Sequence, residues 1–314
     1  MKRILLIGLL VVQSAAASEL SLITSEGFGF SDSARFSEPQ ARLMALRAAK
    51  IDAQRNLLEV INGVRVTAGT TVKDMMLESD IIGTRVKGML QGAFETTSSV
   101  TLEDGSWVAS VTMAVCMDKA DAVCRAKPTL AAITQPNLKP SAPEDRFGVN
   151  DLPAEAAAVV TSQVTPVAAD SINEAESIST EGQSAAPTTP EPATKPATKP
   201  AAVSLATGLI LDASALNYTP MLDVRVRTKQ GKELYGPGHV AMGSDWLHWA
   251  PNLDAAEKMA EIIGESPLIL KPESLGEVTE LVVSDNDAIT LFTSNTLGGD
   301  FLAAGKVIIV VAGS

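Results

Sequence analysis

The first apolar pattern in the chain alternates over residues 20–30, which predicts a strand with one buried face. Ser37 with Gln40 forms a capping-box pattern, and Asn62-Gly63 is a helix stop signal. Between these signals the sequence predicts a helix over residues 38–61. Five large apolar residues are expected to line one side of it: Leu43, Leu46, Leu57, Val60 and Ile61, with Met44, Ile51 and Leu58 beside them. Small side chains keep this face low: Ala41, Ala45, Ala48, Ala49 and Ala53. A low face lets a helix lie close against strands.

Three further extended segments are expected in the first half of the chain. Residues 63–72 are rich in β-branched side chains, which favours a strand. The runs 88–102 and 106–117 flank Asp104-Gly105, and Asp-Gly between alternating runs is the strongest short hairpin signal. Residues 80–92 are interrupted by glycines, and their conformation stays ambiguous.

The last third of the chain carries a second set of short strands with few helices. Residues 207–236 predict a strand, a turn and then a hairpin around residues 229–232. Residues 253–264 form a short amphipathic helix pattern that ends at Gly264. The remaining elements are a strand over 279–284, a helix over 285–295 capped by Ser284 with Asp287, and a buried terminal strand over 306–311.

A proline-rich stretch separates these two sets of elements. Eleven of the seventeen prolines lie between Pro128 and Pro200. Such a composition cannot bury enough apolar surface to offset backbone ordering, so a disordered linker is expected over residues 128–203. Within it, residues 152–164 have the composition of a short helix that could dock elsewhere. The sequence therefore predicts two small α+β domains, 18–127 and 204–314, each with a helix packed on antiparallel strands.

The N-terminus has the pattern of a secretory signal peptide over residues 1–17. Lys2 and Arg3 precede an apolar run and the small residues 15–17. No cysteine follows the expected cleavage site, so no lipid anchor is expected there. We expect a periplasmic protein, or one peripheral to the outer membrane. Because export exposes the chain to an oxidising compartment, its two cysteines, Cys116 and Cys124, are expected to form a disulfide.

Charge and motif content narrow the function classes. The formal net charge is −12, and an acidic chain repels phosphate backbones, so we expect no nucleic-acid partner. No phosphate-binding glycine loop or nucleophile elbow occurs. His239 and His248 would hold a metal only with a third ligand such as Asp245, and packing histidines are the favoured interpretation. We expect a non-enzymatic protein without cofactor or metal; a hydrolase that uses a carboxylate pair stays an open alternative.

Three charged residues share the alanine-rich helix: Arg47, Asp52 and Arg55. One interpretation is a solvent-exposed stripe, in which Asp52 makes local pairs with Arg55 and Asn56. The other is a subunit contact, in which the same charges set the register between copies. The sequence leaves both open.

Residues 41–115 resemble the FlgP-like family of small outer-membrane lipoproteins, and also the N-terminal domain of the flagellar protein FlgT. The resemblance rests on four stretches, "ALRAAKIDAQRNLLEVINGVRV", "TTVKD", "VKGMLQGA" and "EDGSWVASVTMAV". The C-terminal domain looks like one that accompanies this module in other envelope proteins, through "GLILDASAL", "KELYG", "SPLIL", "VVSDNDA" and "FLAAGKVIIVV". Family members are often lipoproteins, and this chain lacks the anchoring cysteine.

The resemblance implies a periplasmic building block of a ring or disk around a flagellar motor, a homo-oligomer that also contacts other flagellar or envelope proteins. A closed ring needs a heterologous contact, in which one surface of each copy meets a different surface of the next. The alternative from another class is a monomeric binding module that contacts peptidoglycan or an outer-membrane protein. Sizing of the purified protein would separate the two.

Overall fold

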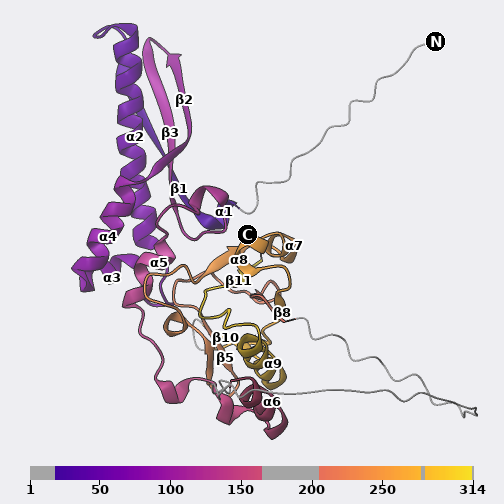
Figure 1. The fold of residues 1–314 in the computed structure, drawn as a ribbon. Coiled ribbons are helices and arrows are strands. Elements are labelled where there is room, and N and C mark those ends of the chain that lie inside the picture. Colours follow the sequence, from indigo (N-terminus) through magenta and orange to yellow (C-terminus); the bar gives the residue numbers. More distant parts are fainter. Residues whose placement is uncertain (1–17, 165–204, 277–279, 313–314) are drawn as a thin grey trace, which may run out of the picture.

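The computed structural model describes residues 18–164, 205–276 and 280–312. Two α+β parts flank residues 165–204, and this confirms the fold class expected from the sequence (Figure 1). The signal peptide expected over residues 1–17 and most of the expected linker lie outside the described residues. No helix among the described residues is long and apolar enough to cross a membrane.

The first part is one long helix lying on a three-stranded antiparallel sheet of order β1-β3-β2. Figure 1 shows this layer pair reaching away from the rest of the chain. Asp104 and Gly105 both have positive φ, 46° and 77°, and they join β2 to β3 in the hairpin that the Asp-Gly signal predicts. The elements are α1 Ser18–Ser21, β1 Leu22–Asp32, α2 Glu38–Gly63, α3 Val72–Glu78, α4 Asp80–Gln91, β2 Phe94–Glu103 and β3 Ser106–Cys116.

Two segments of the first part differ from their sequence interpretation. Residues 63–72 were expected as a strand, but residues 64–71 form a loop between α2 and α3, with an isolated bridge between Arg65 and Thr71. The carbonyls of Arg65 and Val66 instead accept from the N–H groups of Leu222 and Asp223 in the second part. The ambiguous stretch 80–92 is the helix α4, which buries Ile82, Val86 and Met89.

The buried stripe of α2 also differs from the expected one. Ala41, Ala45, Ala49, Ala53, Leu57 and Ile61 recur every four residues and are all 0 % exposed. Four of the large apolar residues expected inside, Leu43, Met44, Ile51 and Val60, are between 39 % and 52 % exposed. The reason is the strand below. A Cβ at Gly27 would lie 2.0 Å from the Ala53 nitrogen, and one at Gly29 would lie 2.3 Å from the Ala45 carbonyl oxygen. Only alanine fits between backbones this close.

The stretch 128–164 corrects the expected boundary of the linker. It follows η1 Ala122–Cys124 and contains α5 Leu130–Thr134, η2 Gln135–Asn137, η3 Pro143–Asp145, η4 Val149–Asp151 and α6 Ala154–Val164. We call residues 128–164 the strap, because they pack along the second part. Phe147 lies edge-on to Phe292, with ring centroids 5.6 Å apart, and its N–H donates to the Glu233 carbonyl. The composition of this segment predicted disorder, because the contacts that stabilise its ordered conformation are made with the second part of the chain.

The second part contains two four-stranded sheets, β6-β5-β10-β9 and β7-β11-β4-β8. The second sheet is parallel throughout, and β5 pairs with β10 in parallel, so the antiparallel arrangement expected for this part holds only at β6 and β9. The elements are β4 Leu209–Asp212, β5 Arg225–Thr228, β6 Glu233–Tyr235, η5 Pro237–His239, β7 His248–Ala250, α7 Leu253–Glu257, α8 Ala260–Ile263, β8 Leu268–Leu270, β9 Ser274–Leu275, β10 Glu280–Val283, α9 Asp285–Leu297 and β11 Val307–Val310.

Candidate functional site

The side of α2 opposite the alanines carries large apolar and basic residues. We call Leu43, Met44, Arg47, Lys50, Ile51 and Arg55 the helix face; all six are exposed. At 100° per residue they lie within one half of the helix, centred on Arg47. Neither Arg47 nor Arg55 has an ion-pair partner among the described residues. The helix face is therefore both apolar and positively charged.

Asp52 does not belong to this face. Its Oδ2 accepts from the Phe28 N–H at 3.0 Å, and Asn56 Nδ2 donates to the Glu26 carbonyl at 2.8 Å. Both bonds occupy the edge of β1 that does not pair with β3. An unpaired strand edge is a template for pairing with another chain. Asp52 and Asn56 therefore block that edge, and Asp52 makes neither of the helix-surface pairs considered from the sequence.

The outer side of the sheet is open and acidic. We call Glu26, Phe28, Phe30, Asp32, Glu103 and Val108 the sheet face; the strand registers place all six on the side away from α2. Phe28 and Phe30 are 60 % and 79 % exposed. The three strands contain no lysine or arginine. These exposed aromatics were not expected from the sequence, although the alternation Gly-Phe-Gly-Phe over residues 27–30 puts both on the face opposite the two glycines.

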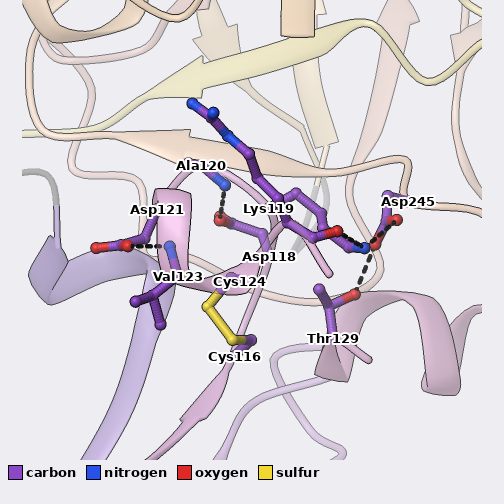
Figure 2. Close-up of a disulfide and its surroundings, with 10 residues drawn as sticks. Cys116, Asp118, Lys119, Ala120, Asp121, Val123, Cys124, Thr129 and Asp245 are labelled. Atoms are coloured by element: carbon purple, nitrogen blue, oxygen red, sulfur yellow. Dashed lines mark hydrogen bonds and ion pairs between the residues drawn. A yellow bond between two sulfur atoms is a disulfide. The ribbon is translucent and has the colours of Figure 1, made fainter. Parts of the chain in front are cut away.

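The predicted cysteine pair forms a disulfide, Cys116–Cys124, with Cα atoms 5.6 Å apart. It closes the turn after β3, and this turn carries the contacts to the second part (Figure 2). Asp118 Oδ2 accepts from the Trp249 N–H at 3.0 Å. Lys119 Nζ lies 3.3 Å from Asp245 Oδ2, and Thr129 donates to Asp245 Oδ1 at 2.8 Å. The disulfide thus holds together a charged junction between the two parts.

Two buried titratable groups lie at this junction. Burial raises the pKa of Asp118 to about 7, although backbone N–H groups of Ala120 and Trp249 favour its charged form. Burial lowers the pKa of His248 to about 4. Asp118 and His248 are 1 % and 3 % exposed. Asp118 lies in the disulfide turn and His248 lies in β7, so both are buried where the two parts meet.

A second charged cluster fixes the strap. Glu233 is 0 % exposed and pairs with Arg225 at 2.9 Å. Arg225 also donates to the Ser141 hydroxyl and to the Lys139 carbonyl, both on the strap. His239 Nδ1 lies 3.6 Å from Glu233 Oε1, and burial lowers the pKa of His239. Breaking such a buried pair leaves an uncompensated charge in the interior, which is costly. Because Arg225 bonds both Glu233 and the strap, this cluster anchors the strap to the second part.

The histidines are not brought together as a metal pair. His239 lies beside Glu233, whereas His248 lies in β7 near Asp245. Within the described ranges, no group of three or more His, Cys, Asp or Glu side chains could hold a metal ion.

Comparison with known proteins finds a relation for the second part. A family model described as the second domain of Treponema pallidum Tp0624 matches residues 208–313, which run from the start of β4 past the end of β11. No curated protein matches the chain. The strap and the first part lie outside the matched residues, so the similarity to the Tp0624 second domain covers only the second part.

Proposed function

We propose that this protein is a non-enzymatic structural component of a cell-envelope assembly, built from copies of this chain. The observation that carries the proposal is the complementarity of the two faces of the first part. The helix face is basic and aliphatic, and the sheet face is acidic and aromatic. They lie on opposite sides of one layer pair. Stacking the sheet face of one copy on the helix face of the next would bury both apolar surfaces and pair opposite charges.

Such a contact is heterologous, because the two surfaces that meet are different. A heterologous contact closes into a ring when the rotation between copies allows it, and otherwise extends into a filament. The two faces belong to the part of the chain that reaches away from the strap and the second part, so neighbouring copies have access to them. We propose a flagellar ring or disk associated with the outer membrane as the specific assembly, on the resemblance of residues 41–115.

The test is sedimentation of the chain from Ser18 onward at increasing concentration. Phe28→Ser with Phe30→Ser disables the sheet face, and Arg47→Glu with Arg55→Glu disables the helix face. All four residues are exposed, so folding should survive, which circular dichroism checks. Each double variant should be monomeric. An equal mixture should form dimers and nothing larger, because each copy keeps one intact face. Raising the ionic strength should weaken the contact of the unaltered chain.

Lys73→Glu with Lys258→Glu is the matched control. It makes the same change of charge at exposed positions away from both faces, and this variant should assemble like the unaltered chain. A chain that stays monomeric at all concentrations would overturn the proposal in favour of a monomeric binding module. Dimers of either double variant alone would show an isologous contact instead. A fluorescent fusion gathered at flagellar bases, with motility lost on deletion, would support the flagellar form; an even envelope signal would refute it.

A further inference from the structure

A cavity of about 550 Å³ lies at the junction between the two parts. It is lined by Arg85 of α4, by residues after the disulfide turn, and by Met242, Gly243 and Asp245 from the loop before β7. Small-molecule sites have volumes in this range and occur preferentially between domains. This cavity uses no residue of the helix face or the sheet face.

The charges that line the cavity are mostly positive. Arg85, Lys119 and Lys127 come from different segments, and Asp245 is the only acid among the lining residues. Lys119 neutralises that acid at 3.3 Å, which leaves Arg85 and Lys127 as an excess of two positive charges. The chain as a whole has a net charge of −12, so this local excess of positive charge has the opposite sign to the net charge of the molecule.

Both remaining cations keep free donors. Arg85 donates one hydrogen bond, from Nη1 to the Ile133 carbonyl at 3.3 Å, and a guanidinium has five N–H donors. The Lys127 ammonium lies 4.6 Å from the centre of the Phe94 ring, a contact that positions it without using an acceptor. Half of the lining residues are apolar: Ala126, Pro128, Ala132, Ile133, Pro136 and Met242.

We propose that this cavity binds a small organic anion with a carboxylate or phosphate head and a short apolar body. The head would lie between Arg85 and Lys127, since charge-assisted hydrogen bonds from such donors are the strong ones. The apolar body would cover the wall, including Met242, which is 82 % exposed in the free protein. Because the walls come from both parts, the bound anion would also strengthen their contact.

Calorimetric titration of the full chain with three probes tests the proposal: sodium octanoate, hexyl phosphate and uncharged hexanol. We expect octanoate or hexyl phosphate to bind and hexanol to bind at least about tenfold more weakly. Arg85→Gln with Lys127→Gln should weaken binding of the anion about tenfold or more. Lys87→Gln, an exposed cation on the same helix that does not line this cavity, should leave binding unchanged. The better of the two anions identifies the head group.

Three results would overturn the proposal. The first is the absence of binding by both anions. The second is equal binding of hexanol, which would show an apolar site without anion selectivity. The third is an Arg85 and Lys127 variant that folds, by circular dichroism, and binds the anion as tightly as the unaltered chain. Because the assembly faces are not involved, none of these outcomes depends on the oligomeric state.

Discussion

At the scale of single residues, two glycines set the spacing of the first part. Gly27 and Gly29 of β1 lie directly under the backbone of α2, and no side chain fits between them. The alanine stripe of the helix has the same cause. Its small residues serve packing within one copy, and Ala49, at 0 % exposed, is unavailable to a neighbouring subunit. The large residues on the opposite side of the helix remain exposed, and they form the helix face on which the proposed contact depends.

Gly27→Ala should destabilise the protein by about 3 kcal/mol or more, at the upper end of what overpacking costs. The added Cβ would lie 2.0 Å from the Ala53 nitrogen and 2.5 Å from the Ala49 carbonyl oxygen, so α2 must shift. Urea unfolding measures the change. Gly69→Ala is the control: nothing lies within 4 Å of its Cβ, and its effect should be near zero. Equal stability of both variants would contradict the close contact.

The junction pair Asp118 and His248 should give opposite pH dependences. Asp118 has a native pKa of about 7 against an unfolded value of about 4, so the native state holds more protons between these limits. Its contribution to stability therefore falls as pH rises from 4 to 7. His248 has a native pKa of about 4 against about 6.5 unfolded, so the unfolded state binds more protons there. Its contribution rises with pH from 4 to 6.5.

The two slopes largely cancel in the unaltered protein, and single substitutions should separate them. Relative to the unaltered chain, the free energy of unfolding of His248→Gln should fall between pH 4 and 6.5. That of Asp118→Asn should rise between pH 4 and 7, whatever the offset from the lost hydrogen bonds. Unfolding in urea across this range measures both differences. Parallel curves for the three proteins would mean that neither group has a shifted pKa.

At the scale of elements, the disulfide turn connects a strand of the first part to the second. Cys116 ends β3, and the loop it closes with Cys124 contains both Asp118 and Lys119. Met117 N–H also donates to the Ser21 carbonyl, which ties α1 to the same turn. The turn acts as one unit because its covalent closure restricts the residues that carry these contacts.

Cys116→Ala with Cys124→Ala should cost about 2–3 kcal/mol, the chain-entropy estimate for so short a loop. It should also loosen the junction, since Asp118 would no longer be held under β7. Hydrogen exchange at the Trp249 amide, which donates to Asp118, should speed up more than exchange at the Val226 amide in β5. Uniform acceleration at both amides would indicate global destabilisation alone.

At the scale of the whole molecule, the strap decides how the two parts stay together. Residues 128–164 follow the first part in sequence but pack on the second, through Arg225, Glu233 and Phe292. Cleavage anywhere in residues 165–204 would therefore leave the strap attached to the first part while its contacts lie on the second.

A chain cut between residues 180 and 190, at an inserted protease site, should elute from a sizing column as one species. Its two fragments should separate only in denaturant. Arg225→Ala should weaken this association, because Glu233 then loses its ion pair and the strap loses its anchor. Lys271→Ala removes an exposed lysine that pairs with Asp212 away from the strap; it is the control and should leave the association intact. Fragments that separate without denaturant would show that the strap is not held.

Local signals in the sequence predicted the helix from Glu38, the Asp-Gly hairpin, the capped helix from Asp285 and the cysteine pair, because each depends on residues close together in the chain. Contacts over long separations needed the tertiary structure. Composition could not show that residues 128–164 would be ordered. The surface that orders them, which includes Glu233, belongs to the second part and lies far away in the sequence. Periodicity placed Leu43 and Val60 on the side that packs against the strands, because it carries no information on how closely Gly27 and Gly29 let β1 approach the helix. The positive cavity arises because the fold brings Arg85 of α4 to the same space as Lys119 and Lys127, which lie in and just after the disulfide turn.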